Sequence, residues 1–167
     1  MEIFEIKEGC YFGSSYFYFS DSNLDEILFE QKENHKGFSI EEEYVWEYLI
    51  TFLNKLTDKK ADYGIEVKIT KENVKKLCDD IQNICHSMQT NFNDPSLDEL
   101  KTRFSIIYFM TDEEQTKHDY YNISKDEVKM FIENRKGRIM DFYNCFIEHI
   151  KQLADSTEGN ELYIHSP

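Results

Sequence analysis

The stretch "GIEVKITKENVKKLCDDIQNICHSM", residues 64–88, carries the two periodicities of regular secondary structure one after the other. Residues 64–69 alternate between apolar and polar side chains, which predicts a β-strand. Thr70 then offers a helix N-cap, and apolar side chains follow at helical spacing: Val74, Leu77, Cys78, Ile81, Ile84, Cys85 and Met88. A strand that runs directly into a capped helix indicates a chain with both α and β structure.

Further strands are predicted toward both ends of the chain. Residues 1–7 and 15–20 are short aromatic or β-branched runs, and the two glycines between them permit a turn, so we expect an N-terminal hairpin. In the second run, Phe17 and Phe19 should face the core, while Tyr16 and Tyr18 should reach a wetter boundary. Residues 161–165 are expected to add a last strand.

Three Ser-x-x-Glu sequences, a pattern typical of helix starts, predict helices that begin at Ser39, Ser96 and Ser124. The first helix should reach residue 56. The end of the second stays open, because residues 104–110 fit either a helix or a buried strand. The third, near 124–155, has the longest apolar stripe, and Gly137 within it indicates a kink or the close approach of another backbone.

These elements predict an α+β fold in a single domain, 1–167. Its small, mainly antiparallel sheet would combine the N-terminal hairpin with the strand near 64–69 and pack against four to five helices. The chain of 167 residues is 40% hydrophobic and 15% aromatic, which is enough apolar surface for one core and unlike the composition of a disordered chain.

Charge is the strongest global signal. The formal net charge is −14, distributed as −8 over residues 1–57, −1 over 58–110 and −5 over 111–167. A field of this sign repels phosphate backbones, which argues against direct nucleic-acid binding, and it attracts basic proteins. The alternative is that the acidic surface serves solubility alone.

The sequence also bears on location. Its first residues lack the positive charge of a secretory signal, and no apolar run reaches the roughly 18 residues that a membrane helix needs. We therefore expect a cytoplasmic protein with no membrane contact. The four cysteines, Cys10, Cys78, Cys85 and Cys145, are scattered through ordinary secondary structure, so we expect reduced thiols.

No known catalytic motif is present. Ser14 and Ser15 follow Gly13 without the Gly-x-Ser-x-Gly pattern, and no Cys-x-x-Cys or glycine-rich phosphate loop occurs. The sequence therefore favours a protein that is not an enzyme, with no cofactor and no metal. The alternative is a small-molecule hydrolase whose site combines residues distant in sequence, with Asp119, His118, His86 and Cys10 as participants.

The best predicted binding segment is residues 111–122, "TDEEQTKHDYYN". Tyrosines give contact area at low entropic cost and carboxylates complement a basic partner, a combination typical of docking loops. We therefore predict partner-binding residues in this segment and in the second strand: Asp112, Glu113, Glu114, Asp119, Tyr120, Tyr121, Tyr16 and Tyr18. The alternatives are an ordinary solvated connection, or a metal site through Asp112, Glu114, His118 and Asp119, whose spacing matches no known motif.

In this profile of acidic ends, a Tyr-rich strand at residues 16–19 and an acidic, Tyr-bearing segment, the chain resembles the bacterial immunity proteins that neutralise polymorphic or contact-dependent growth-inhibition toxins. The resemblance implies a basic cognate toxin as partner, in many cases a nuclease whose cationic active site is covered. No individual site residue is carried over by it. A DNA-mimic inhibitor is a further hypothesis, which the nearly neutral middle third of the chain disfavours.

Overall fold

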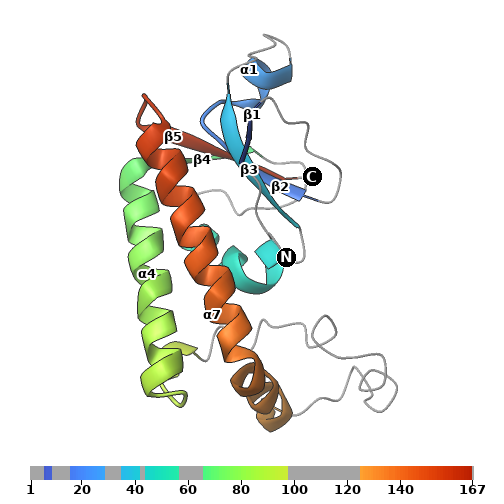
Figure 1. Cartoon of the computed structure of the whole chain (residues 1–167), viewed down its shortest axis with the longest axis vertical. Coiled ribbons are helices and arrows are strands. Elements are labelled where there is room, and N and C mark those ends of the chain that lie inside the picture. The colour runs from blue at the N-terminus through green and yellow to red at the C-terminus, as the bar shows by residue number, and fades with distance from the viewer. Residues whose placement is uncertain are drawn as a thin grey trace, which may run out of the picture.

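The computed structural model describes residues 6–8, 16–28, 35–41, 44–56, 66–97 and 125–166. The fold is α+β, as predicted, and combines an antiparallel sheet with helices that include a long C-terminal one (Figure 1). In chain order the elements are β1 (Ile6–Glu8), β2 (Tyr16–Ser20), α1 (Leu24–Leu28), β3 (Lys36–Glu41), the π-helical turn η1 (Val45–Leu49), α3 (Ile50–Leu56), β4 (Glu66–Thr70), α4 (Lys71–Thr90), the 3₁₀ turn η2 (Pro95–Leu97), α7 (Lys125–Ser156) and β5 (Glu161–His165).

The strands follow the order β1-β3-β2-β5-β4, and all neighbouring pairs are antiparallel. The strand predicted at the C-terminal end, β5, is confirmed and lies between β2 and β4. The predicted N-terminal hairpin is wrong, because β3 lies between β1 and β2 and pairs with both. Within the β2–β3 pair the Phe38 ring stacks on that of Phe19 with centroids 5.0 Å apart, a contact that favours pairing of these two strands.

The helix predicted from Ser39 is also corrected. Ser39 lies within β3, and the described helical segment that reaches Leu56 follows this strand as the π-helical turn η1 and then α3. The physical reason is burial on one face of the strand, because Phe38 and Ile40 are both fully buried, whereas Ser39 between them is half-buried. This alternation has the period of a strand, and the packing it allows overrides the local capping pattern.

The sheet has two unlike faces. One is apolar and faces the helices, with buried side chains from four strands: Phe17, Phe19, Phe38, Ile40, Val67, Ile69, Leu162 and Ile164. The strand register places the intervening residues on the opposite, polar face: Tyr16, Tyr18, Ser20, Gly37, Ser39, Glu41, Glu66, Lys68, Thr70, Glu161, Tyr163 and His165. Phe17 and Phe19 thus face the core as predicted.

Helices α4 and α7 run side by side in opposite directions (Figure 1). The prediction for α4 is confirmed: the Thr70 side chain accepts a hydrogen bond from the Asn73 backbone N–H at 3.2 Å, and Cys78 and Cys85 are buried in the core. At the same end of the molecule, Lys71 Nζ donates to the Thr157 carbonyl at 2.6 Å. The start of α4 is therefore tied to the end of α7.

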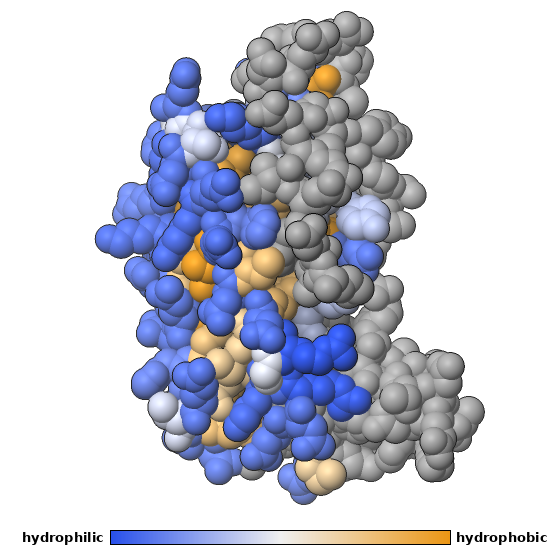
Figure 2. Space-filling view, in the orientation of Figure 1, coloured by the Kyte–Doolittle hydropathy of each residue, from blue (hydrophilic) through white to orange (hydrophobic). Residues whose placement is uncertain are grey.

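Helix α7 confirms the long C-terminal helix that the apolar stripe predicted, and its buried side chains include Phe142, Tyr143 and Phe146. Gly137 is exposed, and a Cβ atom there would meet nothing within 4 Å. The predicted close approach of another backbone at Gly137 is therefore wrong. Where Figure 2 colours the described residues, most of this face is hydrophilic, and apolar residues form a broken strip within it. In the part of the chain that the structure describes, no helix is long and apolar enough to cross a membrane.

Candidate functional site

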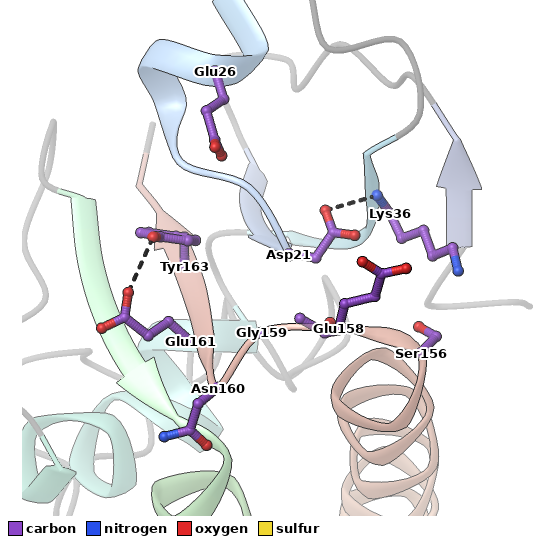
Figure 3. A pocket seen from close by; sticks show the side chains of 10 residues that line it. Asp21, Glu26, Lys36, Ser156, Glu158, Gly159, Asn160, Glu161 and Tyr163 are labelled. Atoms are coloured by element: carbon purple, nitrogen blue, oxygen red, sulfur yellow. Dashed lines mark hydrogen bonds between the residues drawn. The ribbon is translucent and has the colours of Figure 1, made fainter.

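A surface groove of about 690 Å³ lies where the end of α7 turns into β5 (Figure 3). The turn after β2, the helix α1, the start of β3, the end of α7, the α7–β5 connection and β5 itself all contribute to it. Its lining residues are Asp21, Glu26, Lys36, Ser156, Thr157, Glu158, Gly159, Asn160, Glu161 and Tyr163. Four carboxylates thus share the groove with one ammonium group.

Two of these carboxylates are held in place by the turn that follows β2. Asp21 Oδ1 accepts hydrogen bonds from the Lys36 backbone N–H at 3.0 Å and from Ser22 Oγ at 2.8 Å. Glu26 accepts from the Asn23 backbone N–H at 3.0 Å, while Asn23 Oδ1 accepts from the Glu26 N–H at 2.8 Å. The second pair is a reciprocal capping box at the start of α1. Both carboxylates are therefore fixed before any ligand arrives.

A third carboxylate belongs to an ion pair at the edge of the groove. Glu161 Oε1 lies 2.8 Å from Lys68 Nζ, and the Tyr163 hydroxyl donates to Glu161 Oε2 at 3.4 Å. The hydrogen bond from Lys68 lowers the pKa of Glu161, so this side chain is ionised at neutral pH. Burial raises the pKa of the Tyr163 phenol, which therefore keeps its proton and remains a hydrogen-bond donor.

The fourth carboxylate, Glu158, is on an exposed residue in the turn between α7 and β5. Figure 3 shows its side chain reaching between Asp21 and the Lys36 ammonium group. Even with Lys36 counted, the lining carries three more negative than positive charges. Such a groove complements a cationic side chain or a basic peptide segment, and it repels anions.

A serine, a histidine and a carboxylate lie together beside this groove, yet they do not form a hydrolase triad. His165 Nδ1 lies 3.2 Å from Glu66 Oε2, and Nε2 donates to the Ser22 backbone carbonyl at 3.1 Å. The Ser22 hydroxyl instead donates to Asp21, and both Ser22 and His165 are buried. A triad needs the histidine on the serine hydroxyl and access for substrate, and neither condition is met here.

A cysteine and a histidine one helical turn apart on α7 likewise fail the test for a nucleophile. Cys145 Sγ lies 3.7 Å from His149 Nδ1, but this nitrogen is 2.8 Å from the Cys145 carbonyl and donates its proton there. It therefore cannot accept the thiol proton. Burial raises the pKa of Cys145, the opposite of what an activated thiolate requires.

The predicted binding residues fall into two groups. Tyr16 is 38% exposed and its hydroxyl donates to Glu41 Oε1 at 3.4 Å, so it does reach the surface of the polar face. Tyr18 is fully buried, so the expectation that its phenol reaches a wetter boundary is wrong. Its side chain is covered on the polar face, where it packs against both His35 and His165.

The other predicted site residues lie outside the described residues, except for one histidine. Outside are the proposed docking residues Asp112, Glu113, Glu114, Asp119, Tyr120 and Tyr121, and the hydrolase participants Cys10 and His118. His86 is exposed on α4, beside the buried stripe as predicted. Among the residues with described positions, no group of three or more His, Cys, Asp or Glu side chains could hold a metal ion.

Sequence reasoning missed the groove, although one local signal was available. Asn23-Leu24-Asp25-Glu26 has the spacing of a capping box and so marks a short helix directly after β2. Asp21 and Glu158 line the same groove although they are 137 positions apart. No local sequence pattern predicts this, because it depends on the pairing of β5 with β2. No protein-family model, curated protein or solved structure matches this chain.

Proposed function

We propose that this chain is a binding protein for a basic protein partner and acts as an immunity protein that neutralises a cationic toxin, such as a nuclease. The observation that carries the proposal is the groove at the α7–β5 turn, which is lined by the carboxylates of Asp21, Glu26, Glu158 and Glu161. In the described lining Lys36 is the one basic side chain, and Lys68 pairs with Glu161 at the edge. A lysine or arginine of a partner would find several ionised acceptors there.

The rigidity of the groove also supports a binding role. Asp21 and Glu26 are fixed by backbone hydrogen bonds, and Glu161 is fixed by Lys68. A partner that docks against such side chains loses little free energy to ordering them. Tyr163 adds a half-buried aromatic ring and a phenol donor at the same place, and tyrosine is enriched among the residues that dominate binding energy at interfaces.

The charge of the whole chain acts in the same direction. With a net charge of −14, the protein attracts a basic partner over distances comparable to the Debye length, about 8 Å at physiological salt. Rim charges set mainly the association rate, whereas desolvated groups at the centre of an interface set the dissociation rate. The proposal therefore predicts fast association that slows as salt rises.

The test begins with capture of the partner by the tagged protein from host lysate at low and moderate salt. Binding kinetics of the purified partner are then measured for the wild type, for Glu158→Lys and for Glu133→Lys. Both glutamates are exposed, but Glu133 lies on α7 outside the groove, so the second variant makes the same charge change elsewhere. Glu158→Lys should lower the association rate roughly 3- to 10-fold more than Glu133→Lys does.

Equal rates for the two variants would remove the groove from the proposal. A triple variant, Asp112→Lys, Glu113→Lys and Glu114→Lys, measures in the same assay whether the segment predicted from sequence docks instead. Loss of association rate and of salt dependence in the triple variant alone would assign the interface to that segment. Failure to capture any basic protein at either salt would refute the immunity function itself.

A further inference from the structure

Two buried histidines lie on the polar face of the sheet, outside the groove lining. His35, directly before β3, is 3% exposed and His165, at the end of β5, is 2% exposed. The Tyr18 ring contacts both, edge-on to the His35 ring and stacked with the His165 ring, with centroids 6.0 Å apart in each case. Histidine is seldom fully buried, and here two rings share one aromatic neighbour.

Groups from every neighbouring described element face His165. From β4, Glu66 Oε2 lies 3.2 Å from Nδ1; from the turn after β2, the Ser22 carbonyl lies 3.1 Å from Nε2. The Tyr163 ring, on the same strand, stacks at 6.4 Å, and Tyr18 of β2 covers the other side. Among the described residues, the titratable groups that face His165 thus include one carboxylate, two phenols and a second imidazole, that of His35.

Protonation of His165 has a net cost in this setting. Burial lowers its pKa, Glu66 and the Ser22 carbonyl oppose that effect, and His35 adds to it. The unfolded chain, with a histidine pKa of about 6.5, therefore binds the proton more strongly than the folded chain does. The stability that neutral His165 contributes is complete above pH 6.5 and is lost as the pH falls below it.

The strand that carries His165 amplifies this local effect. β5 pairs with β2 on one side and β4 on the other, so β4 is joined to the rest of the described sheet only through β5. A charge placed on His165 acts at the pairs Tyr18↔His165 and Glu66↔His165, which are the last pair of each ladder. Those are the positions at which β5 can separate without breaking the whole sheet first.

We propose that His165 acts as an acid-operated latch: through its contacts with Tyr18 and Glu66 it holds the end of β5 in the sheet at neutral pH, and it releases that end when its imidazole takes up a proton. A charge on this buried ring is poorly solvated, so water must enter. The latch is independent of whether the groove binds a basic protein.

The test is amide hydrogen exchange on the full chain at pH 7.5 and 5.5, corrected for the intrinsic pH dependence of exchange. Protection of β5 amides should fall between the two pH values by about 10-fold more in the wild type than in His165→Gln, because one imidazole takes up a proton on opening. The comparison with this variant is needed because acid also relieves the self-repulsion of the acidic chain everywhere. An equal fall in the wild type and in His165→Gln would overturn the latch.

Variants identify the responsible groups. His165→Gln keeps a side-chain N–H that can donate to the Ser22 carbonyl but cannot become charged, so its β5 protection should be nearly independent of pH. His86→Gln is the matched control, since His86 is exposed on α4, and it should behave as the wild type. NMR titration of the wild-type imidazoles needs no variant, and a midpoint for His165 at or above 6.5 would also overturn the proposal.

Discussion

Gly37→Ala gives the most direct test of the packing on the polar face of the sheet. A Cβ atom at residue 37 would lie 2.4 Å from the Phe19 carbonyl oxygen and 2.6 Å from both Cζ and the hydroxyl oxygen of Tyr18. Real Cβ contacts essentially never fall below 3.0 Å. The Phe19 carbonyl oxygen and the new Cβ atom must therefore separate by about another 0.6 Å, in addition to any movement of Tyr18. That carbonyl is backbone in a paired strand, and the Tyr18 ring is fully buried, so neither neighbour has free space.

Overpacking of a filled interior costs about 1–3 kcal/mol, and a backbone clash places Gly37→Ala at the upper end, about 3 kcal/mol. With a urea m-value of about 2 kcal/mol per M for a domain of this size, the unfolding midpoint should fall by about 1.5 M. Urea denaturation followed by circular dichroism measures this shift at pH 7.5.

Gly137→Ala is the matched control, because the same methyl group there meets nothing within 4 Å on the exposed side of α7. In a helix interior, alanine is favoured over glycine, so this variant should gain about 1 kcal/mol. The reasoning would be refuted if the two variants shifted the midpoint in the same direction, or if Gly37→Ala lay within 0.5 kcal/mol of the wild type.

Two further predictions concern buried polar groups. Tyr143→Phe removes the hydrogen bond to the Tyr48 carbonyl at 3.0 Å and leaves a buried acceptor unpaired, which should cost about 1–2 kcal/mol in the same urea assay; an unchanged midpoint would mean that the carbonyl finds another donor. Burial raises the pKa of Cys78 and of Cys85 to about 11, so both thiols should resist Ellman's reagent at pH 8 until urea unfolds the chain, whereas the half-buried Cys145 should react before either of them. Peptide mapping by mass spectrometry shows which cysteine is labelled, and early labelling of Cys78 would contradict the burial of its side chain on α4.

The parts of the fold that could be predicted from the sequence are those with a local cause. The run from residue 64 to Met88 holds its strand alternation, its Thr70 cap and its apolar stripe within 25 residues, and each feature is in the structure. The helix start predicted at Ser39 was wrong because a Ser-x-x-Glu pattern stabilises a helix start only weakly, by about 1 kcal/mol, whereas burial of Phe38 and Ile40 in a strand contributes more.

Long-range arrangement accounts for the remaining differences. Sequence proximity favours pairing of β1 with β2. In the structure β3 lies between them and pairs with β1 along one edge and with β2 along the other. Alternation correctly placed Tyr16 and Tyr18 on one face, but periodicity does not say whether that face is covered, and only Tyr16 is exposed. The groove depends on Asp21 and Glu158 lining one hollow, an arrangement of distant residues that no local pattern encodes.

The place of β5 in the sheet has a consequence for folding kinetics. Its pairing of His165 with Tyr18 closes a loop of almost 150 residues, so the central ladder has a very high contact order. Closing so long a loop carries an entropic cost that is recovered only once the ladder has formed. We therefore expect slow folding, in which the facing edges of β2 and β4 stay unpaired until β5 inserts between them. Those two open edges are where intermolecular strand pairing, and hence aggregation, would begin.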